Sequence, residues 1–174
     1  MPDADALLRR IEATPELAEL LAWPADFDLA RRDPVEELRL PSGLALTPVA
    51  GDGAGGTFFL CGPDGAIRPV LYADSEGQAA LIAADLPEAV ALVAAHPYWR
   101  DLLHGHPAAE LEAEFADDDP DFPETRARLL ALLEVDPPSA EDALARLRAA
   151  VARTVPDFVP FATHPEGKTS YELL

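Results

Sequence analysis

The stretch that most limits the fold of this chain lies between residues 44 and 103, where short apolar runs alternate with turn sequences. The runs cover residues 44–50, 57–61, 67–73 and 78–83, and the sequences GDGAGG, GPDG and DSEG separate them. Apolar runs of this length, divided by turns rich in Gly and Asp, are typical of strands joined by hairpins. We therefore expect four consecutive antiparallel strands in a β-meander.

A helix is predicted directly after the last of these strands, at residues 86–95. Asp85 precedes Leu86, Pro87 and Glu88. The Asp85 carboxylate can accept a hydrogen bond from a free amide at the helix start, while Glu88 reaches back toward the cap. A meander followed by a helix predicts an α+β fold, with a central antiparallel sheet and flanking helices.

Two short helices are predicted before the sheet, at residues 3–13 and 15–22. Leu7 and Ile11 lie on one face of the first helix, and Thr14 is placed to cap the second. The connector that follows, at residues 25–37, has no regular pattern.

Two further features of this N-terminal part are predicted from residue type. Trp23 is expected to fill part of the core, because large aromatic side chains are usually buried. Residues 38–40 are expected to add an edge strand to the sheet, since the turn at residues 41–43 separates them from the first apolar run.

The composition changes after residue 103 and divides the chain into three predicted parts. Residues 1–103 form the α+β core, and residues 104–124 form an acidic connector interrupted by prolines. Residues 125–174 are expected to pack on the core as a C-terminal helical hairpin followed by an irregular tail. The two helices are predicted at residues 125–135 and 139–154, and the tail contacts at Phe158 and Phe161.

Charge is the most unusual property of the composition. Thirteen Lys and Arg residues stand against 32 Asp and Glu residues, for a net charge of -19. This charge repels phosphate groups, so nucleic acid and anionic membranes are not expected partners. A basic protein is the natural complement.

The single cysteine, Cys61, allows no intramolecular disulfide and suits a reducing compartment. The N-terminus lacks the pattern of a signal peptide, and no apolar run approaches the roughly 20 residues of a membrane-spanning helix. We expect a cytoplasmic protein.

The glycines at positions 51, 53 and 56 match the spacing of a dinucleotide-binding loop, and Asp74 follows at a suitable distance. That motif must end a strand and open a helix, because the helix amides hold the pyrophosphate. Residues 57–61 are apolar, aromatic and β-branched, and therefore predict a strand instead. We interpret the loop as a hairpin turn whose glycines adopt positive φ, and we expect no cofactor.

Two segments match the sequence patterns of metal sites only in part. His104 and His106, with His96 and Glu110 nearby in the sequence, contain possible zinc ligands, but they lack a second spaced pair and any cysteine. The acidic run at residues 117–121 resembles a calcium loop only in part. Phe122 stands where the sharp turn needs Gly, and Arg128 stands where the bidentate Glu belongs. No metal is therefore expected.

Nucleophilic catalysis has no convincing candidate. Ser75 lacks the glycine pair of a nucleophile elbow, and Cys61 lies in a predicted buried strand that disfavours a thiolate. We expect a protein that is not an enzyme.

Four segments of the chain resemble the SUKH superfamily, which groups fungal glucan-synthesis regulators with bacterial immunity proteins against secreted toxins. They are GDGAGG at 51–56, FFL at 58–60, RPVLYADSEGQ at 68–78 and IAADLPEAVALV at 82–93. The resemblance covers about a third of the chain and depends on the order and spacing of the segments. It implies a non-enzymatic binding protein.

Two functions follow from this resemblance. The first is an immunity protein that neutralises a toxin by direct binding, with a basic nuclease as a toxin that the acidic charge would suit. The second is a regulatory or scaffold protein with a cellular partner, like the fungal cell-wall synthesis regulators. The acidic segment is the predicted partner-binding surface, with carboxylates that guide association and aromatic side chains that anchor it. These residues are Asp117, Asp118, Asp119, Asp121, Phe115, Phe122, Tyr98 and Trp99.

Overall fold

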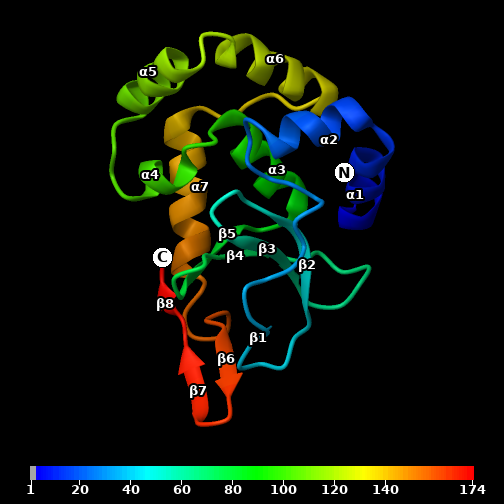
Figure 1. Cartoon of the computed structure of the whole chain (residues 1–174), viewed down its shortest axis with the longest axis vertical. Helices are drawn as coiled ribbons and strands as arrows, with labels where there is room; N and C mark the ends of the chain where they lie inside the picture. Colours follow the sequence, from blue (N-terminus) through cyan, green and yellow to red (C-terminus); the bar gives the residue numbers. More distant parts are fainter. Residues whose placement is uncertain (1–2) are drawn as a thin grey trace.

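The computed structural model describes residues 3–174 and shows a mixed α+β fold, as the sequence predicts (Figure 1). Two sheets and seven helices are present in these residues. The helices are α1 (Ala4–Ala13), α2 (Pro15–Ala22), α3 (Leu86–Ala95), α4 (Trp99–Leu103), α5 (Ala108–Asp118), α6 (Phe122–Leu133) and α7 (Ala140–Ala152). The strands are β1 (Leu38–Arg39), β2 (Leu46–Gly51), β3 (Thr57–Cys61), β4 (Val70–Ala73), β5 (Gln78–Ala83), β6 (Phe161–His164), β7 (Gly167–Ser170) and β8 (Glu172–Leu173).

The predicted meander is the centre of the molecule. Strands β2, β3, β4 and β5 pair in sequence order, and each pair is antiparallel. The C-terminal strand β8 then pairs with β5 in parallel orientation, which completes a sheet in the order β2-β3-β4-β5-β8. The prediction of four consecutive antiparallel strands is confirmed.

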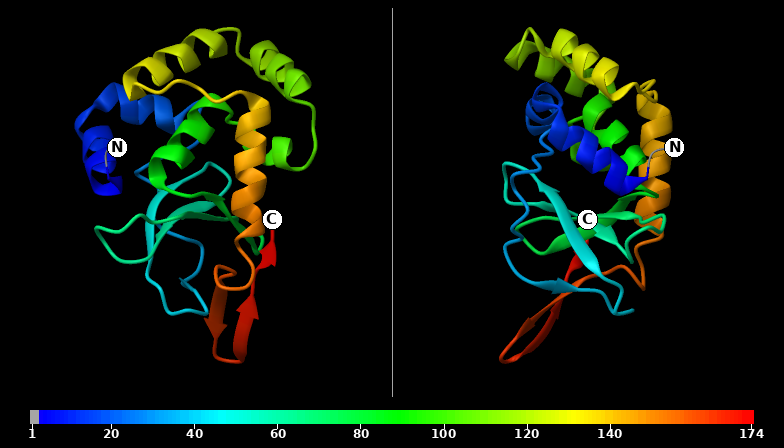
Figure 2. Two further views of the ribbon diagram at one scale, coloured as in Figure 1. Left: turned by 180° about the vertical axis from the view of Figure 1, so that it is seen from behind. Right: turned by 90° about the vertical axis from the view of Figure 1, so that its right-hand side faces the viewer.

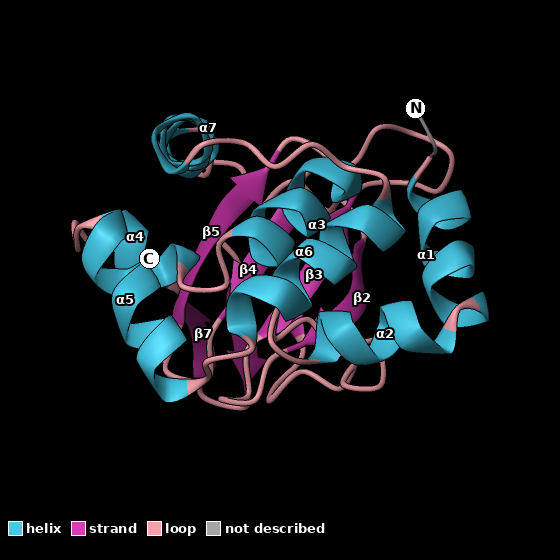
Figure 3. Cartoon of the chain, turned by 90° about the horizontal axis from the view of Figure 1, so that it is seen from above, coloured by secondary structure: helices cyan, strands magenta, loops and turns pink. Residues whose placement is uncertain are grey.

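Both faces of this sheet are covered, which explains why its strands are almost wholly apolar. Phe58 and Leu60 of β3 join the core on the side of the helices, whereas Phe59 and Cys61 join a second core on the other side. Helices α3 and α6 lie over one face of the sheet in the view from above (Figure 3). The second core includes Ala162 of β6, so the small β1-β6-β7 sheet contributes to the other layer.

Helix α3 begins with the predicted cap. The Glu88 amide donates to the Asp85 carboxylate at 2.9 Å, and the Glu88 carboxylate accepts from the Ala84 amide at 2.6 Å. Thr14 does not cap α2 through its side chain, because its hydroxyl donates to the Arg10 carbonyl at 2.9 Å. That part of the prediction for the second helix is wrong.

Two expectations for the N-terminal part need correction. Trp23 is 65% exposed and does not fill the core, whereas Leu17 and Leu21 of α2 are buried. Strand β1 exists, but it pairs with β6 in the separate three-stranded sheet and not with the central sheet. The partner strand comes from the last part of the chain, which no local pattern near residue 38 could reveal.

The acidic segment at residues 104–124 was expected to be an irregular connector, but it contains the whole of helix α5 and the start of α6. Helices α6 and α7 are both present, yet they are not packed mainly on one another as a hairpin would be. Helix α6 packs on α2 and α3, while α7 packs along β5 and α4 (Figure 1). The Leu81 amide of β5 donates to the Thr154 hydroxyl after α7 at 2.9 Å, which fixes α7 to the sheet.

The C-terminal tail is also more regular than predicted. Strands β6 and β7 form an antiparallel hairpin that projects at the opposite end of the molecule from α5 and α6 (Figure 2). Phe161 lies in β6, and Phe158 packs against the second core. The irregular tail of the prediction is therefore a hairpin followed by β8.

Candidate functional site

A buried polar network joins two turns at one end of the central sheet. Asp52, in the β2–β3 turn, is 8% exposed and accepts hydrogen bonds from the amides of Ala54 at 3.0 Å and Gly56 at 2.8 Å. Its second carboxylate oxygen accepts from the Tyr72 hydroxyl at 2.5 Å. Burial, together with the Asp52 carboxylate, raises the pKa of Tyr72 above its usual value, so the hydroxyl stays a donor.

Arg100 of α4 extends this network to the neighbouring turn between β4 and β5. Its guanidinium donates to the Tyr72 hydroxyl at 3.1 Å and to the Asp74 carboxylate at 3.3 Å. Asp74 also accepts from two amides of its own turn, those of Glu76 and Gln78, both at 2.9 Å. The carboxylates thus hold the turns in shape, and Arg100 ties α4 to them.

The glycine-rich turn forms a hairpin, as expected, but the expected reason for its glycines, positive φ, does not hold for the three that were named. Strand β3 follows the turn directly, so no helix N-terminus is available for a pyrophosphate. None of the glycines at 51, 53 and 56 has positive φ; Gly55 does, at +90°. A Cβ on Gly56 would lie 2.3 Å from the Tyr72 hydroxyl, and a Cβ on Gly51 would lie 2.5 Å from the Arg31 carbonyl. These two glycines allow close packing.

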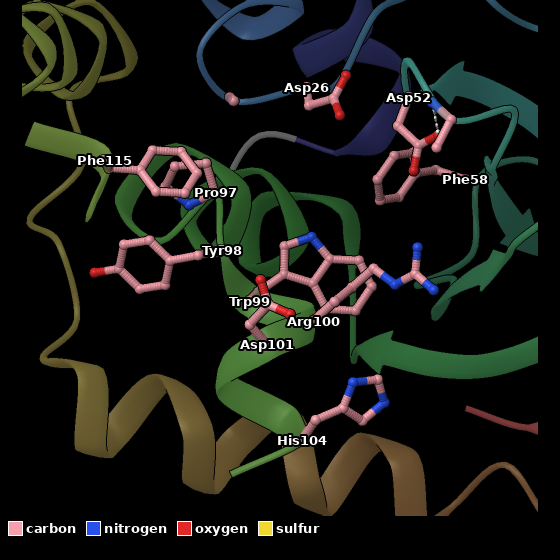
Figure 4. A pocket seen from close by; sticks show the side chains of 12 residues that line it. Asp26, Asp52, Phe58, Pro97, Tyr98, Trp99, Arg100, Asp101, His104 and Phe115 are labelled. Carbon is pink, nitrogen blue, oxygen red and sulfur yellow. Dashed lines mark hydrogen bonds between the residues drawn. The ribbon is translucent and has the colours of Figure 1, made fainter. Parts of the chain in front are cut away.

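A pocket of about 280 Å³ lies beside the network, between α4, α5 and the loop after α2 (Figure 4). Aromatic and acidic side chains line it, including Trp99, Phe115, Asp26 and Asp101. Asp26 is a non-glycine residue with a φ of +54°, and its carboxylate accepts from the Gly53 amide at 2.8 Å. Burial raises the pKa of Asp26, and the neighbouring Asp52 carboxylate adds to this effect.

A second network fixes the helices above the pocket. Glu112 of α5 accepts from the Tyr98 hydroxyl and forms a two-point ion pair with Arg126 of α6. Arg126 also donates to the Ala95 carbonyl at the end of α3, at 3.2 Å. Burial works against ionisation of Glu112, but the hydrogen bonds from Arg126 and Tyr98 outweigh it and lower the pKa of Glu112.

His96 completes this second network from the end of α3. Its Nε2 lies 3.0 Å from the Pro138 carbonyl, and its Nδ1 lies 3.3 Å from the Tyr98 hydroxyl. Burial lowers the pKa of His96. The side chain therefore holds structure together and is not presented as a metal ligand.

We use the name acidic arch for residues 108–128, which form α5, the turn after it and the first half of α6 (Figure 1). Eight of these residues are acidic and two are arginines. Both arginines are engaged, Arg126 with Glu112 and Arg128 with Glu16. Within residues 3–174, seven arch carboxylates form no ion pair: Glu110, Glu114, Asp117, Asp118, Asp119, Asp121 and Glu124.

The predicted partner-binding residues divide into two groups. The four aspartates at 117, 118, 119 and 121 lie on the outer surface of the arch, with Asp119 partly covered. Of the predicted aromatic anchors, only Phe115 is partly exposed. Tyr98, Trp99 and Phe122 are buried, so none of them projects from the surface as the prediction supposes. Sequence reasoning missed Asp26 and Arg100, whose roles depend on contacts between distant segments.

The other residues considered from the sequence have structural surroundings. Burial raises the pKa of the Cys61 thiol to about 12, and the Ser75 hydroxyl donates to the Ala54 carbonyl at 3.1 Å. His104 and His106 are exposed. Residues 3–174 contain no group of three His, Cys, Asp or Glu side chains arranged to hold a metal ion.

Within the same residues, every helix is too short or too polar to cross a membrane. Comparison of the chain with protein-family models, curated proteins and solved structures finds no match.

Proposed function

We propose that this chain is a non-enzymatic binding protein whose acidic arch docks onto a basic protein. The observation that carries this proposal is the set of seven exposed or half-buried carboxylates that form no ion pair, all within α5, the turn after it and the first half of α6. Like charges held close together destabilise a folded chain, and no ion pair within residues 3–174 offsets the charge of these seven carboxylates. A positively charged partner would offset that repulsion.

The arch presents its charges on a fixed surface. The Glu112–Arg126 pair joins α5 to α6, and the Arg126 bond to the Ala95 carbonyl joins both to α3. Arg128 reaches Glu16 of α2 at 2.8 Å from the other side. A rigid acidic surface loses less conformational entropy on binding than a mobile loop would, and its field directs a basic partner toward it before contact.

The polar network at the turns favours binding over catalysis. Asp52 and Asp74 accept hydrogen bonds from turn amides, and Tyr72 and Arg100 connect the two turns. Each group therefore has a role in holding the sheet end together. A general acid or base needs a proton-transfer partner on a substrate, whereas these groups have their partners within the chain.

Toxin neutralisation is the specific function that we propose, with the cytoplasm as its place of action. Nuclease toxins need basic surfaces to hold phosphates, so an acidic protein can compete for the same contacts. The resemblance of the meander to the SUKH superfamily supports this proposal. A regulatory or scaffold role with a cellular partner is the alternative that the same resemblance offers.

Co-expression tests the choice between them. The genes next to this one should include a toxin with a basic domain, and expression of that domain should stop growth unless this chain is present. A variant with Asp117, Asp118, Asp119 and Asp121 changed to Asn should protect less well at equal expression. Full growth arrest in the presence of the unchanged chain would contradict the immunity proposal and leave the regulatory role.

A further inference from the structure

The pocket beside α4 contains a polar group that the fold does not satisfy. Trp99 is 4% exposed, and its indole N–H has no hydrogen-bond partner among residues 3–174. The only completely enclosed side-chain nitrogen or oxygen without a partner in these residues is Arg68 Nε. The Trp99 N–H is therefore not completely enclosed; Trp99 lines the pocket, and Figure 4 shows the indole nitrogen directed toward the space between Asp26 and Phe115.

The pocket also holds negative charge close to aromatic surface. Asp26 and Asp101 line it from two different segments, and Phe58, Trp99 and Phe115 supply aromatic faces and edges. Arg100 also lines the pocket, but its guanidinium is bonded to Tyr72 and Asp74. Carboxylates beside aromatic rings form a favourable environment for an organic cation, which gains charge attraction and cation–π contact together.

We infer that this pocket receives a lysine or arginine side chain of the basic partner, and that the Trp99 N–H donates to a backbone carbonyl of the same partner segment. The inference rests on the proposed function for the identity of the partner as a basic protein. It adds a specific anchoring site to the charged surface of the arch, because Phe115 of α5 borders both.

The chemistry of the lining selects this occupant over others. An anion would meet the Asp26 and Asp101 carboxylates, and an apolar group would leave the negative charge of both carboxylates uncompensated and the indole N–H without a partner. A cationic side chain attached to a peptide supplies what both kinds of group need. The cation pairs with a carboxylate, and the adjacent carbonyl accepts from the indole.

The test uses small probes and the two indole N–H signals of the whole protein in ¹H–¹⁵N NMR spectra. The Trp23→Phe variant identifies which signal belongs to Trp99. The probe is N-acetylarginine methylamide, and N-acetylcitrulline methylamide is the matched neutral probe with a similar shape. We expect the arginine probe to shift the Trp99 signal in a saturable way, and the citrulline probe to cause at most about a fifth of that shift at equal concentration.

Two single variants locate the site. Asp26→Asn keeps an oxygen that can accept from the Gly53 amide and should weaken binding of the arginine probe about fivefold to tenfold. Asp157→Asn removes the same charge at an exposed position outside the pocket and the arch and should leave probe binding unchanged. Equal shifts with both probes, no shift of Trp99, or an unchanged affinity in Asp26→Asn would overturn the inference.

Failure of the pocket inference and failure of the proposed function give different experimental results. Probe binding at Trp99 does not require the toxin, so the pocket inference can hold even if the arch has no partner. Conversely, charge-dependent association through the arch with no response of Trp99 would retain the proposed function and exclude the pocket as its anchor.

Discussion

Replacing Gly56 by Ala should destabilise the protein strongly, because the glycine turn packs directly on a buried tyrosine. The new Cβ would lie 2.3 Å from the Tyr72 hydroxyl and 2.6 Å from two of its ring carbons. Tyr72 cannot move aside easily, since it is fully buried and its ring centre lies 5.0 Å from that of Phe58 and 5.1 Å from that of Trp99. The turn or the ring must shift by most of an ångström.

The expected cost combines two effects. Forcing one extra carbon into a packed core costs about 1–3 kcal/mol, and weakening the Tyr72–Asp52 hydrogen bond adds about 1–2 kcal/mol. We expect the free energy of unfolding to fall by about 3 kcal/mol. For a chain of this length, that change lowers the melting temperature by about 6–12 °C.

The matched control lies in the same turn. A Cβ on Gly53 would meet only the Asp26 carboxylate oxygen, at an ordinary contact distance of 3.5 Å, and Gly53 does not have positive φ. Gly53→Ala should therefore change stability by less than about 1 kcal/mol. Urea and thermal unfolding followed by circular dichroism measure both variants. If Gly56→Ala were as stable as Gly53→Ala, close packing on Tyr72 would not be the reason for glycine at this position.

Three further predictions concern single groups. Burial lowers the pKa of His96, so the native state resists its protonation and the free energy of unfolding should fall as the pH drops below about 6.5. His96→Gln should flatten this pH dependence between pH 7 and 5.5. If urea titrations gave the same slope for the variant, His96 would not be the source of the pH dependence. Glu112→Gln removes the ion pair with Arg126 and should lower the free energy of unfolding by about 1–3 kcal/mol. Amide hydrogen exchange should become faster in α5 than in α3. Uniform exchange in both helices would show that the ion pair does not hold α5 in place. The Cys61 thiol, with its pKa raised to about 12, should resist iodoacetamide at pH 8 in the native protein and react fully in urea. Rapid labelling of the native protein would show that β3 opens.

The central part of the fold was predictable because its signals are local. Turn sequences divided the strands of the meander, and Asp85 marked the start of α3 through a side-chain bond to the amide three residues on. Ser139 caps α7 in the same way, with its hydroxyl accepting from the Asp142 amide at 3.1 Å. Signals of this kind act within a few residues, so Asp85 and Ser139 cap their helices without help from distant segments.

The errors concern contacts between distant segments. Trp23 was expected in the core but is 65% exposed, and residue type alone cannot show whether a side chain at the end of a helix faces the core. Strands β6 and β8 were missed because their partners, β1 and β5, lie far away in the sequence and their own side chains are largely exposed.

The prediction of an irregular connector at residues 104–124 fails for a related reason. Acidic runs with prolines are typical of solvated loops. Leu111 and Phe122 nevertheless fix α5 and α6 by their burial, and Arg126 joins the two helices through Glu112. The pocket beside Trp99 could not be predicted, because Asp26, Trp99 and Phe115 come from three separate segments.

The most direct measurement of the account is the association rate between this chain and the basic toxin domain that we propose as its partner, determined by stopped-flow fluorescence at low and high salt. The arch variant changes Asp117, Asp118, Asp119 and Asp121 to Asn. The control variant changes Asp157 to Asn and Glu76, Glu166 and Glu172 to Gln. These four control acids form no ion pair within residues 3–174, and Glu166 lies in the β6–β7 turn at the opposite end of the molecule (Figure 2).

Both variants remove the same charge, so they differ only in where it is removed. The arch variant should associate about tenfold more slowly than the unchanged chain at low salt, and the difference should shrink at high salt because ions screen the long-range attraction. The association rate of the control variant should fall much less. Equal slowing in both variants would show that net charge alone guides association, and an unchanged rate in the arch variant at low salt would contradict the proposal that the acidic arch is the binding surface.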